Sequence, residues 1–284
     1  MSYNCAVILA AGQGTRMKSS KPKVLAEVLF KPMIDWVTDA AINAGIEDIC
    51  LVTGFKHEMI DEHFGGKFRT VEQKELLGTG HAVMQAKDFI KEHIPGNILV
   101  LNGDAPLIPA ETIKAALDFH KAGNNATTVI SAKVDNPFGY GRIIRSRDGK
   151  LKKIVEEKEA SATEKIVNEV NSGAYWFTSS VLLESLEGII EKHDKKNDKA
   201  VEYYLTDAVE VWKRDLTLSH TTPAHPRSYS VQMTGLSFSS STKSHVKMCS
   251  ESICSTEFQS PAPTELSSPP THRSRRTQRF FRAR

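Results

Sequence analysis

The sequence predicts an α/β domain with a mainly parallel, mixed sheet, because short strand patterns alternate with longer helix patterns over the first 217 residues. Four apolar runs are rich in β-branched residues and bounded by Gly, Asn or Asp, which is typical of buried strands. These runs lie at residues 5–10, 48–54, 96–103 and 126–134. In such sheets ligands bind beyond the carboxyl ends of the strands, so the loops after these runs should carry the site.

The segments between the strand patterns carry apolar residues at spacings of three and four, as amphipathic helices do. The predicted helices span residues 33–44, 57–64, 80–92 and 110–121. Helices that connect parallel strands form right-handed crossovers, so we expect them to cover the sheet.

The chain changes character near residue 218. From 218 to 284 Ser, Thr, Pro and Arg dominate, and apolar residues are too sparse to offset the entropy of ordering the segment. We therefore predict a folded α/β domain at 1–217 and a low-complexity, disordered tail at 218–284. The basic run at the end is more typical of a solvated tail than of a nucleic-acid patch. The abrupt switch looks as if an unrelated reading frame had replaced the native continuation.

Composition narrows the classes of function. Of the 284 residues 25% are charged, and a net charge of +3 is too small to indicate binding to nucleic acid or an anionic membrane. The apolar run at 6–11 is too short for a membrane span or a signal peptide, so we expect a cytosolic protein. Cys5 and Cys50 lie in apolar runs and should be buried, whereas Cys249 and Cys254 have no partner pair for a zinc site.

The strongest chemical signal is the stretch LAAGQGTRM at 9–17, followed by KPKVL at 21–25. Its glycines let backbone N–H groups approach phosphate oxygens, while Arg16 and Lys23 supply positive charge. A tight turn with two surface cations is the alternative. The stretch is neither a Rossmann fingerprint, since Met17 stands in the place of the third glycine, nor a Walker A loop.

A second signal is Asn102-Gly103-Asp104 at the end of the most apolar strand pattern. A carboxylate there would face the ligand crevice and could hold Mg²⁺, which prefers one or two carboxylates together with phosphate oxygens. The alternative is that Asp104 caps the following helix. Its place behind a phosphate loop in the same sheet favours the magnesium site.

These motifs together resemble the nucleotidylyltransferase family. More specific stretches are similar to the N-terminal uridylyltransferase domain of the bacterial bifunctional UDP-N-acetylglucosamine pyrophosphorylase/glucosamine-1-phosphate N-acetyltransferases, over about residues 4–212. They are QKELLGTGHA at 73–82, FGYGRI at 138–143, IVEEK at 154–158, NEVNSG at 168–173 and EYYLTD at 202–207.

The resemblance implies that UTP and N-acetylglucosamine 1-phosphate form UDP-N-acetylglucosamine and pyrophosphate, with Mg²⁺, for cell-envelope precursors. It places the nucleotide on Leu9, Ala10, Ala11, Gly12, Arg16 and Lys23, the uracil on Gln73, Gly78 and Thr79, and the rest of the nucleotide near Asn102 and Gly103. It makes Asp104 the magnesium ligand, and it places the sugar on Gly141, Glu156 and Asn171. The catalytic residues would be Arg16, Lys23 and Asp104. On sequence alone Glu156 and Asn171 would be surface polar residues.

The chain departs from this family in two ways. It has no hexapeptide repeats of the β-helix that carries acetyl transfer, so acetyltransferase activity is not implied. Beyond Trp212 it also lacks the family's GVN motif, whose Asn is the second magnesium ligand. Two alternatives therefore stay open, namely another sugar-phosphate nucleotidylyltransferase and a non-catalytic nucleotide-binding protein. The sequence does not predict an oligomeric state.

Overall fold

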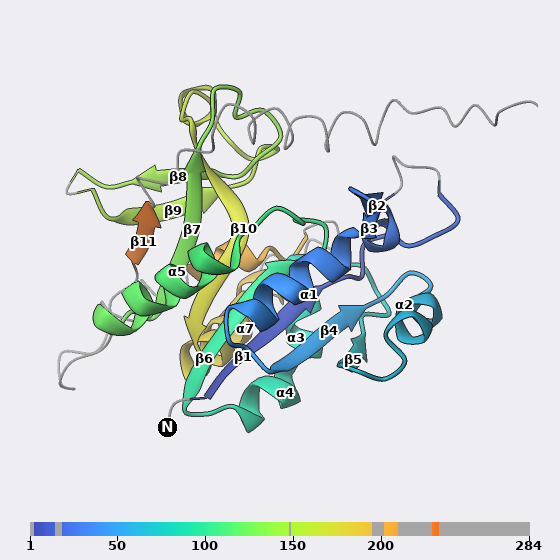
Figure 1. The fold of residues 1–284 in the computed structure, drawn as a ribbon. Coiled ribbons are helices and arrows are strands. Elements are labelled where there is room, and N and C mark those ends of the chain that lie inside the picture. Colours follow the sequence, from blue (N-terminus) through green and yellow to red (C-terminus); the bar gives the residue numbers. More distant parts are fainter. Residues whose placement is uncertain (1–2, 15–18, 148, 195–201, 210–228, 233–284) are drawn as a thin grey trace, which may run out of the picture.

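A computed structural model describes the chain except for residues 1–2, 15–18, 148, 195–201, 210–228 and 233–284. In the described residues, nine strands form one sheet in the order β11-β7-β10-β6-β1-β4-β5, with the β8–β9 hairpin attached to β10 (Figure 1). The strands are β1 (Tyr3–Leu9), β4 (Asp48–Thr53), β5 (Arg69–Glu72), β6 (Gly96–Asn102), β7 (Thr127–Lys133), β8 (Arg142–Arg145), β9 (Leu151–Val155), β10 (Glu169–Thr178) and β11 (Tyr229–Gln232).

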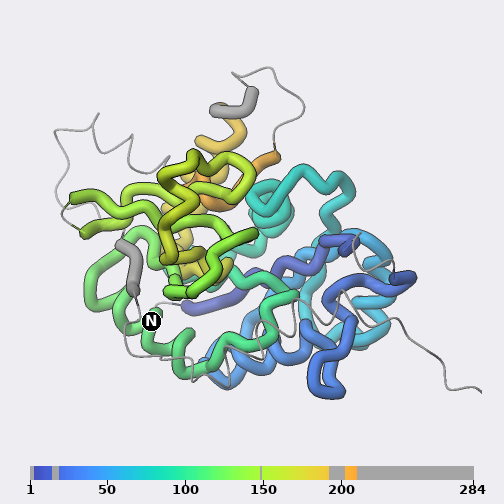
Figure 2. The backbone as a smooth tube through the Cα atoms, turned by 90° about the horizontal axis from the view of Figure 1, so that it is seen from above, coloured from blue at the N-terminus to red at the C-terminus, as the bar shows by residue number. Residues whose placement is uncertain are grey.

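The sheet is mixed, as the sequence predicts. Its N-terminal half is parallel, since β1 pairs in parallel with β4 and β6, and β4 pairs in parallel with β5. Strand β10 runs antiparallel to both β6 and β7, and it also pairs with β8. Viewed from above in Figure 2, the yellow-green segments that include β8, β9 and β10 lie on the opposite side from the blue N-terminal segments.

Helices cover both faces of this sheet. They are α1 (Met33–Asn43), α2 (His57–Phe64), α3 (Thr79–Gln85), α4 (Lys87–Glu92), α5 (Ala110–Ala122), α6 (Ala162–Lys165) and α7 (Ser179–Asp194). Short 3-10 turns lie at η2 (Lys23–Leu25) and η3 (Leu205–Asp207), and a small hairpin consists of β2 (Glu27–Val28) and β3 (Lys31–Pro32).

One prediction for these helices is wrong in detail. The apolar spacing predicts a single helix over residues 80–92, but the helix breaks at Ala86 into α3 and α4. Ala86 is fully buried, and its backbone leaves the helical conformation at φ −87° and ψ 14°. The apolar spacing continues across the break, so the pattern alone could not reveal it.

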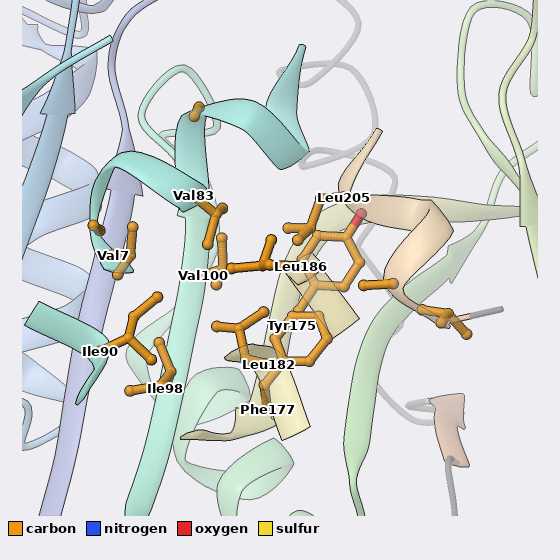
Figure 3. Close-up of a cluster of buried hydrophobic side chains, with 14 of the residues drawn as sticks. Val7, Val83, Ile90, Ile98, Val100, Tyr175, Phe177, Leu182, Leu186 and Leu205 are labelled. Atoms are coloured by element: carbon orange, nitrogen blue, oxygen red, sulfur yellow. The ribbon is translucent and has the colours of Figure 1, made fainter. Parts of the chain in front are cut away.

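The core consists of one large apolar cluster on each face of the sheet. One cluster packs α3, α4 and α7 against the strands, and Figure 3 shows its residues Val83, Ile90 and Leu186 around Val100 of β6. The other packs α1 and α5 against the opposite face. Cys5 and Cys50 are both buried free thiols, as predicted.

Of the predicted tail, the structure describes Tyr229–Gln232 alone. These four residues form β11, which pairs in parallel with β7 at the edge of the sheet. An edge strand offers unpaired backbone groups, so a short extended segment can add to it without a large apolar content. Cys249, Cys254 and the rest of the predicted tail lie outside the described residues. No helix in the described part of the chain is long and apolar enough to cross a membrane.

Candidate active site

The carboxyl ends of β1 and β6 lie side by side and bring the two strongest sequence signals together. Leu9 is in register with Asn102, and the Gly103 N–H group donates to the Leu9 carbonyl over 2.9 Å. A Cβ on Gly103 would lie only 2.9 Å from that carbonyl oxygen, so this close approach requires glycine. Asp104 therefore starts a loop directly beside the loop that follows Leu9.

The loop after β1 is held by the neighbouring strand β4. Ala10 N–H donates to the Val52 carbonyl over 2.8 Å, and Phe55 N–H donates to the Ala11 carbonyl over 3.3 Å. Gly12 is exposed, and a Cβ on it would meet no atom within 4 Å. The loop thus has a fixed beginning and an open surface at the glycine that the sequence assigns to phosphate binding.

Lys23 and Asp104 meet at this edge of the sheet, although 81 positions separate them. Lys23 Nζ lies 2.7 Å from Asp104 Oδ2, and their side chains are 38% and 36% exposed. Gly14 packs on the aliphatic part of Lys23, because a Cβ there would lie 2.7 Å from Lys23 Cβ. Arg16, the other predicted cation, lies outside the described residues.

On the other side of β4, Gln73 supports the loop that leads into α3. Gln73 is 4% exposed, its N–H group donates to the Thr53 carbonyl over 2.7 Å, and its side-chain Nε2 donates to the Gly78 carbonyl over 3.1 Å. The same Nε2 lies 3.0 Å from His81 Nδ1. The structure therefore brings Gln73 and Gly78 together, and the side-chain nitrogen of Gln73 stabilises the loop that leads into α3.

Three residues that the resemblance assigns to a sugar lie together: Gly141 directly precedes β8, Glu156 directly follows β9, and Asn171 lies in β10. Asn171 N–H donates to the Gly141 carbonyl over 2.9 Å. A Cβ on Gly141 would lie 3.4 Å from Glu156 Oε2 and 3.5 Å from Asn171 Cβ. Burial raises the pKa of Glu156, so this carboxyl group is not an ordinary surface acid. The structure places Glu156 and Asn171 in one partly buried group with Gly141.

A bulge in β10 connects this group to the end of β6. The register of β10 against β7 shifts between Asn171 and Ala174, and Gly173 adopts φ +77° within that bulge. A Cβ on Gly173 would lie 2.2 Å from Asn102 Nδ2, so Asn102 packs directly over the glycine. The bulge thereby brings Asn171 near the strand end that carries Asp104. Sequence reasoning did not assign a role to Gly173.

The loop that carries Gly141 is fixed by a buried ion pair that sequence reasoning also missed. Arg142 is 1% exposed, and its Nη2 lies 2.7 Å from Glu157 Oε2. The same carboxylate oxygen accepts a hydrogen bond from Gly139 N–H over 3.1 Å, and Arg142 also donates to the Tyr140 carbonyl. Arg142 and Glu157 both lie inside the stretches that carry the family resemblance, and that resemblance was the only sign in the sequence that they matter.

Asp104 offers one carboxylate to a divalent cation. Among the described residues, no group of three or more His, Cys, Asp or Glu side chains could hold a metal ion. Mg²⁺ commonly binds through one or two carboxylates and the phosphates of its substrate, and it keeps several water molecules. A half-exposed carboxylate beside the predicted phosphate loop fits an ion delivered with a nucleotide.

Comparison with known proteins agrees with this arrangement. The chain matches the nucleotidyl transferase family over residues 5–218. It is 49% identical over 214 residues to a bifunctional protein GlmU of Clostridium botulinum (strain 657 / Type Ba4), which covers 75% of this chain and 45% of that protein. It is 46% identical over 206 residues to the GlmU protein of Acetivibrio thermocellus, covering 72% of this chain and 43% of that protein.

The chain therefore spans less than half the length of these curated relatives. Among solved structures, a UDP-glucose pyrophosphorylase complexed with UDP-glucose superposes with a TM-score of 0.59 at 21% identity. The match covers 76% of this chain and 88% of that structure. At this identity the likeness shows the fold alone, and it confirms the predicted α/β nucleotidyltransferase architecture.

Proposed function

The chain belongs to the nucleotidyl transferase family, and on that premise we propose that it joins UTP to N-acetylglucosamine 1-phosphate and releases pyrophosphate. The observation that carries the proposal is the convergence of two groups of residues at one edge of the sheet. Lys23 and Asp104 form one group, and Gly141, Glu156 and Asn171 form the other. The Gly173 bulge against Asn102 links the two groups.

The first group suits a nucleoside triphosphate. The open loop from Leu9 to Gly12 would face its phosphates, and Lys23 would neutralise part of their charge, with Arg16 as the second cation. Gly103 directly follows β6 and lies against the Leu9 carbonyl, where only a residue without a side chain fits. The base would contact the loop that contains Gln73, Gly78 and Thr79. Hydrogen bonds hold this loop beside the carboxyl end of β4.

The second group suits a sugar with several hydroxyl groups. Glu156 offers carboxylate oxygens as acceptors and Asn171 offers an amide, and Gly141, which is buried, lies against both. These groups would bind N-acetylglucosamine 1-phosphate and present its phosphate to the nucleotide. The GlmU relatives, at 49% and 46% identity, favour this sugar over other sugar phosphates.

The reaction then requires no general base. The sugar 1-phosphate is already an anionic nucleophile, so the barrier lies in bringing two anions together and in stabilising the charge that develops at the attacked α-phosphate. Lys23 and Arg16 would supply positive charge at that point, and the two loops would align the reacting groups. Asp104 would hold Mg²⁺, which when bound neutralises phosphate charge and orients the phosphates.

Pyrophosphate release from UTP and N-acetylglucosamine 1-phosphate tests the proposal directly. We expect Mg²⁺-dependent release with this pair of substrates, and much slower release with glucose 1-phosphate or with ATP in place of UTP. Binding of UTP without any turnover over a wide range of Mg²⁺ concentrations would instead identify a nucleotide-binding protein that does not catalyse the reaction. Faster turnover with another sugar phosphate would replace the proposed sugar.

A further inference from the structure

We propose that Thr206 is a positioning residue for sugar binding, because its hydroxyl group holds the Glu156 carboxylate while the backbone beside it holds the loop that faces the base. This inference rests on the proposed function. The residues concerned are the four of segment 203–206, which includes the start of η3. Neither the motif pattern nor the resemblance assigned a role to this segment.

The base-side contact of segment 203–206 is made by its backbone. Tyr203 N–H donates to the Leu77 carbonyl over 2.7 Å, and Gly80 N–H donates back to the Tyr203 carbonyl over 2.7 Å. Leu205 N–H donates to Thr79 Oγ1 over 3.0 Å. Three hydrogen bonds therefore fasten this segment to the loop that would meet uracil.

The glycines of that loop are required by the same contact. A Cβ on Gly78 would lie 2.6 Å from the Tyr203 carbonyl oxygen, and one on Gly80 would lie 2.9 Å from it. Gly78 also has φ +110°, which side chains with a Cβ rarely adopt. The LGTG stretch is thus shaped to receive segment 203–206, whatever its glycines also do for a nucleotide.

The core fixes segment 203–206 in place. Leu205 is 2% exposed and lies in the apolar cluster of Figure 3, where it stands beside Tyr175 of β10. Thr206 is 5% exposed. Since Leu205 is held by packing on one side and by Thr79 on the other, the Thr206 side chain next to it has little freedom to move.

On the sugar side, Thr206 Oγ1 donates to Glu156 Oε1 over 3.1 Å. The other carboxylate oxygen, Oε2, is the one that faces Gly141, at 3.4 Å from where a Cβ would lie. Thr206 therefore engages one oxygen of Glu156 and leaves the other directed toward the predicted sugar-binding group. A fixed acceptor is what recognition of a single sugar hydroxyl requires, because the geometry of a hydrogen bond is restrictive.

The surroundings of Glu156 give this hydrogen bond an effect on the protonation of the carboxyl group. Burial raises the pKa of Glu156, and the nearby acids Glu159, Asp207 and Glu202 raise it further. The phenol groups of Tyr175 and Tyr204 also lie within electrostatic reach of this carboxylate. The hydrogen bond from Thr206 acts in the opposite direction and lowers the pKa of Glu156. Thr206 thus favours the ionised carboxylate, which is the stronger acceptor.

The test compares Thr206→Val, which removes the donor at nearly constant volume, with Thr206→Ser, which keeps it. A hydrogen bond to a charged group contributes about 1.5–3 kcal/mol, so the KM for N-acetylglucosamine 1-phosphate should rise about 10- to 150-fold in the valine variant. The KM for UTP should stay within twofold. Because the pKa of Glu156 rises without its donor, the acid limb of kcat/KM for the sugar phosphate should move to higher pH. The serine variant should restore both.

Thr112 provides a matched control. It is buried to 4% exposure in α5, outside the site, and its hydroxyl oxygen has no hydrogen-bond partner among the described residues. Thr112→Val should therefore leave both KM values and the pH profile unchanged. If Thr206→Val does not fold, Glu156→Gln tests the same arrangement, because the amide can still accept from Thr206 but cannot titrate. The acid limb should then shift, because Glu156 no longer contributes to it, and a limb identical to that of the wild-type chain would overturn the inference.

The outcomes distinguish a failure of the proposed function from a failure of the role of Thr206. A wild-type chain that neither turns over nor binds UDP-N-acetylglucosamine in calorimetry would overturn the proposed function and this inference with it. An active wild-type chain whose Thr206→Val variant keeps its sugar-phosphate KM and its pH profile would overturn the role of Thr206 alone. A rise in the KM for UTP as large as that for the sugar phosphate would show a general structural role instead.

Discussion

Replacing Asp104 by Asn removes one negative charge at the end of β6 and keeps the shape of the side chain. In the wild-type chain Asp104 Oδ2 lies 2.7 Å from Lys23 Nζ, with the two side chains 36% and 38% exposed. Water screens an ion pair of this exposure, so it contributes about 0.2–1 kcal/mol to stability. A loss of that size lowers the melting temperature of a domain of 150–250 residues by about 4 °C at most.

The expected effect on activity is much larger. If Asp104 holds the Mg²⁺ that would stabilise the charge developing during the reaction, its loss should cost about 3–4 kcal/mol of transition-state stabilisation, which corresponds to a fall in kcat of about 100- to 1,000-fold. The Mg²⁺ concentration for half-maximal activity should also rise, since no group of three or more His, Cys, Asp or Glu side chains among the described residues could hold the ion instead. A role of Asp104 in the reaction thus predicts a large fall in kcat together with a small fall in melting temperature.

Pyrophosphate release under saturating UTP and sugar phosphate, titrated with Mg²⁺, measures the first effect, and thermal unfolding measures the second. Asp39→Asn is the matched control, because Asp39 also pairs with a lysine, Lys31, at comparable exposure. It should keep wild-type turnover. The assignment of Asp104 is refuted if its Asn variant keeps more than a tenth of the wild-type kcat with an unchanged Mg²⁺ requirement.

Three further perturbations probe other parts of the chain. Arg16→Ala should lower kcat about 100-fold or more while the melting temperature stays constant, and a wild-type kcat would remove Arg16 from the phosphate loop. Gly173→Ala should destabilise the fold by about 1–3 kcal/mol in urea unfolding, because φ is +77° and the new Cβ would collide with Asn102; an unchanged midpoint would contradict the tight bulge. Deleting residues 218–284 removes β11 but none of the described site residues, so the melting temperature should fall by about 4 °C at most, and a larger fall would show that the tail packs extensively on the domain.

The strands that sequence patterns identified share one property, which is burial on both faces. In β6, six of the seven residues are buried, so its apolar run is continuous and easy to recognise. Strand β5 is exposed or half-buried at every position, and its sequence RTVE gives no comparable signal. Strand β10 begins with the polar stretch EVNSG, where the bulge lies, and it was not among the strands that the sequence predicted.

The candidate site divides in the same way. Leu9 to Gly12 and Asn102 to Asp104 lie at the carboxyl ends of recognisable strands, so elementary rules about parallel sheets are enough to predict that they lie together. Glu156 and Asn171 gave no such signal and entered only through the resemblance to a family. Their convergence depends on a hairpin and a bulge that bring them beside Gly141.

Gly173 shows in physical terms why such a feature stays hidden. A glycine inside a strand pattern indicates a bulge or a close backbone approach, but it does not say which partner approaches. Here the partner is Asn102, which precedes Gly173 by 71 positions, and the contact exists only because β10 runs antiparallel beside β6. The register of that pairing therefore sets the distance between the two groups of the candidate site. Any change that shifts β10 along β6 should impair sugar binding and nucleotide alignment together, even if every residue that contacts a substrate is retained.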